Sequence, residues 1–154
     1  MTHSAISTSK VLRQIVIGQV QAIPEERFDI QAEGFNNTIR WNIGHVIYWM
    51  DKYSTLSFAS LSAVPDHYAS LFNSGTKPSD WEITPPSKEE LVNLLSSQLS
   101  RFAALTPEIL DAKLEAPFVM GPFQFDTAGE LFNFALMHEA THLGTISSQL
   151  KCVG

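Results

Sequence analysis

The chain of 154 residues lacks several features that mark particular classes of protein. Cys152 is the only cysteine, so no disulfide can form within the chain, and a reducing compartment such as the cytoplasm is expected. No apolar run approaches the roughly 20 residues that span a bilayer. The segment from Met1 to Ser4 lacks the basic flank and apolar run of a signal peptide. These absences predict a soluble cytoplasmic protein.

Positive charge is also scarce. Ten Lys and Arg residues stand against 16 Asp and Glu residues, which gives a formal net charge of −6. A chain of this charge has no field that attracts phosphates, so binding to nucleic acid or to an anionic membrane is not expected. The hydrophobic fraction of 44% and the length are typical of one globular domain, which we expect to cover residues 1–154.

The apolar residues recur with the period of amphipathic helices in four long segments. The first runs from Ile6 to Ile23, where Pro24 ends the pattern. The second runs from Ile39 to about Phe58. The third and fourth follow Ser87 and Thr127, each of which stands three residues before a glutamate in the spacing of a capping box.

The segment between the second and third helices is too rich in proline to be one helix, although Pro65 to Phe72 could form a short one. A connection of about 28 residues is far longer than the 2–8 usual between antiparallel neighbours, so these two helices are expected to run parallel. The predicted fold is an all-α four-helix bundle in up-down-down-up order. Lys113 to Phe125 alternates weakly about Gly121 and Pro122, which is typical of a small hairpin or an irregular loop.

Two histidines of the fourth helix are the first candidates for chemistry. His138 and His142 are four residues apart, which places both imidazoles on one face of the helix. The same stripe carries Leu131 and Phe134, so this face is expected to point into the bundle. Alone, the pair is as easily explained by two hydrogen-bonded core histidines as by a metal site.

A third histidine favours the metal site. His45 lies in the middle of the second helix, among Trp41, Tyr48 and Trp49. Three imidazoles from two facing helices would hold a divalent cation, with zinc or nickel favoured by nitrogen ligands, and would leave a position open. An open position is typical of catalytic sites, where a bound water or thiol loses its proton more easily.

The residues Trp41-Asn42-Ile43-Gly44-His45 and His138-Glu139-Ala140-Thr141-His142-Leu143-Gly144 resemble the DinB-like superfamily. That superfamily includes the bacillithiol transferases of the YfiT type and the mycothiol-dependent maleylpyruvate isomerases. The resemblance implies an up-down-down-up bundle with a metal held by His45, His138 and His142. It also implies transfer of a low-molecular-weight thiol or hydrolysis of a small molecule, and a homodimer. Leu143-Gly144-Thr145 departs from the basic residue and Gly-Gln that often follow the last histidine in this family.

Glu139 completes a His-Glu-x-x-His motif, in which zinc proteases use the glutamate as a general base. No third ligand follows His142, which argues against a peptidase. Glu139 is a candidate base, but its position one step from His138 points about 100° away, which favours a solvated surface residue. Trp41, Tyr48 and Trp49 are candidates for the apolar wall of a substrate pocket, or else simply core.

Two further functions remain open beside a metal-dependent enzyme. One is a metal- or ligand-binding bundle without catalytic activity, related to stress. The other is a structural dimer without metal, in which the three histidines are core residues. His67 in the crossover is a candidate lid residue or a plain surface histidine. Cys152 has only Lys151 as a basic neighbour and is expected to be inert.

Overall fold

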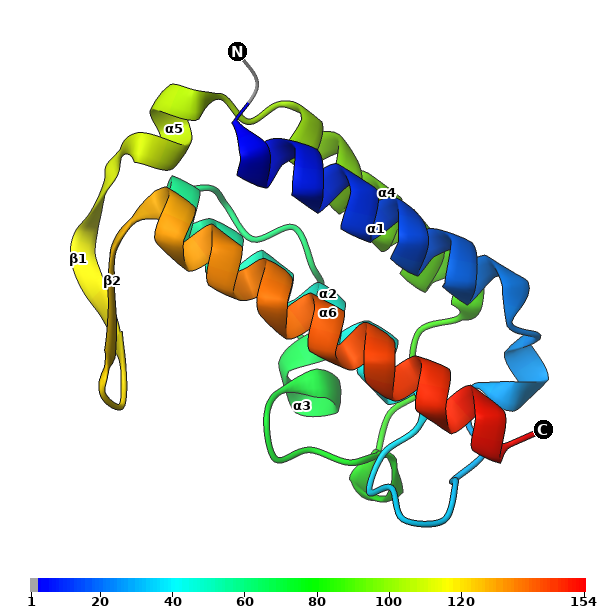
Figure 1. Cartoon of the computed structure of the whole chain (residues 1–154). Coiled ribbons are helices and arrows are strands. Elements are labelled where there is room, and N and C mark those ends of the chain that lie inside the picture. The colour runs from blue at the N-terminus through cyan, green and yellow to red at the C-terminus, as the bar shows by residue number, and fades with distance from the viewer. Residues whose placement is uncertain (1–2) are drawn as a thin grey trace.

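The structure, a computed structural model, describes residues 3–154. Four long helices pack along one another: α1 (Ser4–Ala22), α2 (Ile39–Phe58), α4 (Lys88–Ala103) and α6 (Ala128–Cys152). In Figure 1, α1 and α6 run from the end of the molecule marked N toward the end marked C, and α2 and α4 run in the opposite direction. The connections hold the short helices α3 (Tyr68–Phe72) and α5 (Pro107–Asp111) and the 3-10 turns η1 (Glu25–Arg27) and η2 (Pro78–Asp80).

A two-stranded antiparallel hairpin lies beside the start of α6, in the segment for which the sequence predicted a small hairpin or an irregular loop, so the helical chain is not free of strands (Figure 1). The strands are β1 (Lys113–Met120) and β2 (Phe123–Thr127). Gly121 has a φ of 55° at the turn, which glycine adopts at little cost. Phe118 pairs with Phe125 across the strands, and such aromatic cross-strand pairs stabilise a short hairpin. The fold is therefore mostly helical with one small sheet.

The two predicted capping boxes differ in the structure. At the start of α6, the Thr127 side chain accepts a hydrogen bond from the Glu130 N–H, and the Glu130 carboxylate accepts one from the Thr127 N–H, which confirms the box. At the start of α4, Ser87 accepts from the Glu90 N–H, but the Glu90 carboxylate accepts from the Tyr68 hydroxyl at 2.8 Å. A tertiary contact with α3 has replaced the second half of that box.

A glycine in α2 allows α3 to pack closely against it. A Cβ atom on Gly44 would lie 2.3 Å from the ring of Phe72, which is shorter than any van der Waals contact. Only a residue without a side chain lets the Phe72 ring occupy this position. The close approach brings the main chain of α3 next to His45, the residue after Gly44.

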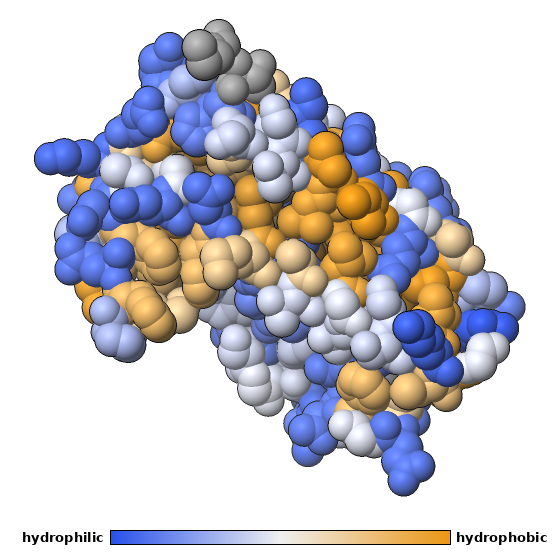
Figure 2. Space-filling view, viewed as in Figure 1, coloured by the Kyte–Doolittle hydropathy of each residue, from blue (hydrophilic) through white to orange (hydrophobic). Residues whose placement is uncertain are grey.

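Apolar residues gather on the face that α1 and α6 share, as Figure 2 shows. Val11 and Ile15 of α1 and Met137 of α6 are each more than half exposed. None of the helices within residues 3–154 combines the length and the apolar character that crossing a membrane requires.

Candidate metal centre

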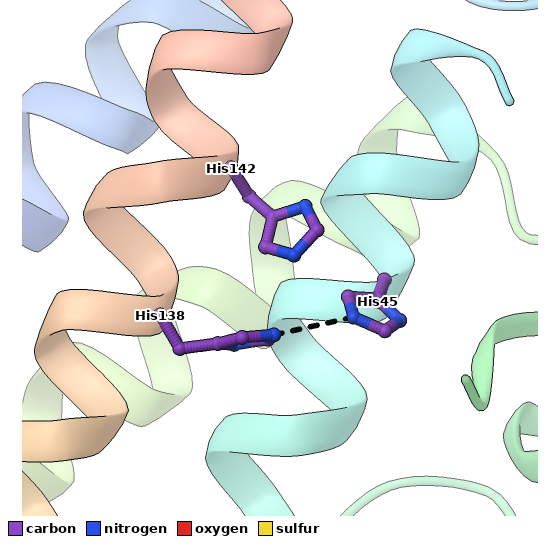
Figure 3. A group of neighbouring side chains, drawn as sticks. All are labelled: His45, His138 and His142. Carbon is purple, nitrogen blue, oxygen red and sulfur yellow. Dashed lines mark hydrogen bonds between the residues drawn. The ribbon is translucent and has the colours of Figure 1, made fainter. Parts of the chain in front are cut away.

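Three histidine side chains converge between α2 and α6 (Figure 3). His45 comes from the middle of α2, and His138 and His142 come from adjacent turns of α6. One ring nitrogen of each lies within 4.8 Å of the other two. The Nε2 atoms of His45 and His138 are 3.3 Å apart. The three imidazoles therefore meet at one place, as the sequence predicted.

His45 is held by the main chain of α3 and by a neighbouring indole. Its Nδ1 lies 2.6 Å from the carbonyl oxygen of Phe72. A carbonyl only accepts, so Nδ1 donates and Nε2 keeps its lone pair for the centre of the triad. Trp41, one turn earlier on α2, stacks on the imidazole with ring centroids 4.3 Å apart. The Trp41 Nε1–H donates to the Thr76 hydroxyl, which fixes the indole in turn.

His142 is held by a chain of amides. Its Nδ1 lies 2.7 Å from Oδ1 of Asn42. The Asn42 amide nitrogen donates to the carbonyl oxygen of Thr38 and to Oε1 of Gln149. Because a main-chain carbonyl can only accept, the orientation of the Asn42 amide is fixed, and His142 Nδ1 must be the donor. Its Nε2 is therefore free to bind a cation.

His138 has less support than the other two. Its ring packs edge-on against Tyr53, with centroids 6.1 Å apart. Within residues 3–154, its Nδ1 has no hydrogen-bond partner, and its Nε2 donates to the lone pair of His45 Nε2 in the metal-free protein. A bound cation would take the place of that proton. The side chain is half-buried, whereas His45 is buried.

Burial keeps the three imidazoles neutral. Desolvation lowers the pKa of His45 to about 4, although the hydrogen bond to Phe72 opposes the shift. Desolvation, with the charges of the other two histidines, lowers the pKa of His142 to about 3. Desolvation also lowers the pKa of His138. Neutral imidazole is the form that binds metal ions, so all three are ready to bind at neutral pH.

The residues present fit a divalent transition metal. Tetrahedral zinc binds imidazole nitrogen at about 2.0–2.1 Å, which places two ligand nitrogens roughly 3.3 Å apart. The His45 and His138 nitrogens are separated by this distance. Bonds from the second ring nitrogen to a carbonyl or an amide, as in His45 and His142, are the usual support of metal-binding histidines. Three nitrogen ligands also leave a coordination position open.

Glu139 is not the surface residue that helical periodicity favoured. Its side chain is 1% exposed and forms a bidentate ion pair with Arg13, at 2.7 Å and 3.0 Å. The Arg13 guanidinium also donates to Gln98 and to the carbonyl oxygen of Leu95 in α4. The prediction was wrong because α6 is covered by α1 as well as by α2. Both carboxylate oxygens accept from Arg13, away from the triad.

The three predicted pocket aromatics lie at different places. Trp41 stacks on His45, and Trp49 approaches the same ring edge-on with centroids 6.5 Å apart. Tyr48 contacts Trp49 and the Lys52 ammonium but none of the three histidines. Tyr53, which was not among the predicted pocket residues, contacts His138 instead. Tyr53 follows Trp49 by one helical turn, so the stripe of His45 and Trp49 contained the signal.

The remaining candidates lie away from the triad. His67 is exposed and contacts Tyr68 at the start of α3. Cys152 is exposed at the end of α6. The supporting bonds from Asn42 and from the Phe72 carbonyl were not predicted from the sequence. Asn42 stands one turn before His45 on α2, which gave a weak signal, but no sequence signal predicts a main-chain oxygen.

The chain matches a known protein family over most of its length. The family model described as the DinB superfamily matches residues 10–146. The match begins in α1, ends in the last third of α6 and includes all three histidines. A search of curated proteins found no match.

Proposed function

Because the chain belongs to the DinB superfamily, we propose that it is a metal-dependent enzyme that acts on a small molecule as a thiol transferase or a hydrolase. In this proposal the chain is one domain with an up-down-down-up bundle, and His45, His138 and His142 hold zinc or nickel. The observation that carries the proposal is the convergence of three neutral imidazoles with one ring nitrogen of each within 4.8 Å of the others.

The residues around the triad have separate tasks in this proposal. The Phe72 carbonyl and the Asn42 amide hold two imidazoles in the tautomer that binds metal. A divalent ion held there would lower the pKa of a water or low-molecular-weight thiol at the open position. Trp41 and Trp49 border His45, and we assign them to the apolar wall that excludes bulk water and packs against the substrate.

Glu139 takes no part in proton transfer in this proposal. A general base needs a free carboxylate oxygen within reach of the reacting proton. Both oxygens of Glu139 accept hydrogen bonds from Arg13, on a side of α6 that faces α1. The same contact argues against a peptidase of the His-Glu-x-x-His type, whose glutamate must reach the water on the metal.

The test begins with protein purified without a histidine tag. Its metal content is measured by inductively coupled plasma mass spectrometry, and we expect about one zinc or nickel ion per chain. His138→Ala is expected to lose the metal and to keep its helical circular dichroism, because the half-buried imidazole adds little to the core. Full metal occupancy in that variant would contradict the assignment of the ligands.

Catalysis is tested separately from metal binding. The metal-loaded protein is assayed with a low-molecular-weight thiol and an aromatic or alkyl electrophile, and for hydrolysis of activated esters and amides. Turnover that disappears in His138→Ala supports the enzyme. A protein that holds metal but turns over none of these compounds would favour the binding protein without catalytic activity.

The homodimer remains a proposal as well. Apolar residues gather on the face that α1 and α6 share (Figure 2), and Val11 and Ile15 of α1 and Met137 of α6 are exposed. Exposed apolar faces are typical of association sites. Sedimentation equilibrium is the direct measurement, and a monomer at micromolar concentration would contradict the proposal.

A further inference from the structure

Gln149 lies two helical turns after His142 on α6, on the same face of the helix. Its side chain is buried, with 1% exposed, and its amide reaches the start of α2, where it bonds to Asn37 and Asn42. An amide has a donor end and an acceptor end, and a buried one needs a partner for each. Gln149 has both partners.

The donor end of Gln149 is fixed by the main chain. Its Nε2 lies 3.0 Å from the main-chain oxygen of Asn37 and 2.8 Å from Oδ1 of the same residue. A main-chain oxygen can only accept, so the amide nitrogen of Gln149 must lie at this end. The other end, Oε1, therefore faces Asn42, whose Nδ2 is 3.1 Å away.

Gln149 in turn helps to orient the Asn42 amide. The Asn42 Nδ2 is surrounded by three acceptors, which are Oε1 of Gln149, Oδ1 of Asn37 at 2.9 Å and the main-chain oxygen of Thr38 at 3.0 Å. A reversed Asn42 amide would place its own oxygen against these three oxygens. The Asn42 oxygen therefore faces Nδ1 of His142, at 2.7 Å, and that nitrogen carries the proton.

The reversed arrangement shows what this orientation does for the candidate metal ligand. With the Asn42 amide turned round, its Nδ2 would face Nδ1 of His142, which would then have to accept. The imidazole proton would move to Nε2, the nitrogen that is otherwise left for a cation. Binding of a metal ion would then have to displace that proton.

We propose that Gln149 is a positioning residue of the candidate metal centre, which keeps His142 in the tautomer whose Nε2 can bind the cation. It acts through Asn42, because its own hydrogen bonds go to Asn42 and Asn37. The inference rests on the proposed function, since the tautomer matters for binding a metal. His45 takes its tautomer from a main-chain oxygen directly, and His142 takes its tautomer from main-chain oxygens through side-chain amides.

Three variants test this role. Gln149→Met keeps most of the side-chain volume and removes both ends of the amide. Gln149→Glu is the rescue variant, because a buried carboxyl group favours its protonated form, whose O–H can donate to the Asn37 oxygen and whose C=O can accept from Asn42. Gln98→Met is the matched control, since Gln98 is also a buried amide, 7% exposed, but bonds to Arg13 on another side of α6.

Two measurements are made on each variant. The tautomer of His142 is read from the imidazole ¹⁵N and ¹³C chemical shifts of the metal-free protein, with the signals assigned by their absence in His142→Ala. Zinc affinity is measured by competition with a chelator.

In the parent protein we expect His142 to carry its proton on Nδ1. In Gln149→Met we expect its shifts to move toward the Nε2–H form and zinc affinity to fall by about tenfold. This is the lower end of the range for loss of an outer partner, because the Thr38 oxygen still bonds to Asn42. Gln149→Glu and Gln98→Met should keep the parent tautomer and the parent zinc affinity.

The outcomes separate positioning from packing. An unchanged His142 tautomer in Gln149→Met would overturn the inference and leave the metal site intact. Equal tautomer shifts in Gln149→Met and Gln149→Glu would overturn it as well, because a residue that only fills space is replaced better by Met than by Glu. A parent protein that takes up no zinc would overturn the proposed function, and the tautomer measurement would still decide whether Gln149 orients His142. Circular dichroism spectra that match the parent protein establish that each variant is folded.

Discussion

Helix α6 carries two buried polar clusters on different sides, and they differ in how their hydrogen-bonding capacity is used. Toward α1 and α4, Glu139 and Arg13 neutralise each other, and the Arg13 guanidinium also donates to Gln98 and to the carbonyl oxygen of Leu95. Toward α2, the imidazoles of His45 and His142 are held at Nδ1 while their second nitrogens face the centre of the triad. The first cluster pairs its opposite charges within the chain, whereas the second turns ring nitrogens toward a common centre that could hold a cation.

Glu139→Ala breaks the first cluster and has the largest expected effect. It leaves the Arg13 charge buried without a partner, since Arg13 is 0% exposed. We expect the free energy of unfolding to fall by about 3–5 kcal/mol in urea denaturation. The double variant Arg13→Met with Glu139→Met is the control, and it should recover most of this loss because no charge remains buried. A loss below about 1 kcal/mol in the single variant would contradict the role of the ion pair.

Gly44→Ala is expected to move the Phe72 carbonyl, which supports His45, away from the imidazole. The new methyl group would lie 2.3 Å from the Phe72 ring, so α3 must move away from α2. We expect a loss of about 1–3 kcal/mol in the free energy of unfolding, together with weaker zinc binding because the Phe72 carbonyl moves from His45. Gly18→Ala is the control, because nothing lies within 4 Å of the added atom. Unchanged zinc affinity in Gly44→Ala would show that the carbonyl does not support the metal site.

Asn42→Ala removes the hydrogen bond that supports His142 and tests whether the two clusters have separate roles. Without the bond to Nδ1, neither the tautomer nor the ring orientation of His142 is fixed. We therefore expect zinc affinity to fall by about 10–100-fold, as measured by competition titration with a chelator. Gln98→Ala removes a buried amide from the other cluster. It should lower stability without changing zinc affinity. Similar zinc affinities for the two variants would remove the distinction between the clusters.

The pH dependence of the metal-free protein is a separate prediction, because it is a slope per pH unit rather than a loss at one pH. The pKa of His45 is about 4 and that of His142 about 3 when folded, against an ordinary value near 6.5. Below pH 6.5 the unfolded chain therefore binds more protons than the folded one, so the free energy of unfolding falls as the pH drops toward 4 and then 3. The slope is at most about 1.4 kcal/mol per pH unit for each histidine. Urea titrations of the parent and of His45→Ala with His142→Ala should show a shallower slope in the double variant.

Local patterns in the sequence predicted the parts of the fold that local forces determine. The four long helices, the box at Thr127 and the stripe of His138 and His142 all follow from spacing along the chain. Residues whose surroundings depend on other elements were not predictable in this way. Glu139 was expected at the surface because periodicity says which residues share a face but not how many faces are covered. Ser87 kept its cap while Glu90 turned to Tyr68 of another helix.

In the candidate site, too, features set by local sequence were predictable and features set by contacts between elements were not. The three histidines could be found because their side chains carry the chemistry and two of them share a helical stripe. Their supports could not, because Asn42 reaches across to the other helix and the oxygen next to His45 belongs to the main chain of α3. Tyr48 and Tyr53 are both aromatic residues of α2, and only the packing of the hairpin and α6 distinguishes the one near the triad.

The oxygen that holds His45 has a consequence for the way this site can change over generations. Every residue type carries a main-chain carbonyl, so no replacement at position 72 deletes this acceptor. Inherited loss of the contact therefore requires an altered path of the chain, through an insertion, a deletion or a bulkier residue at position 44. The contact with His45 itself thus depends on the course of the crossover past α2 and not on the side chain at position 72.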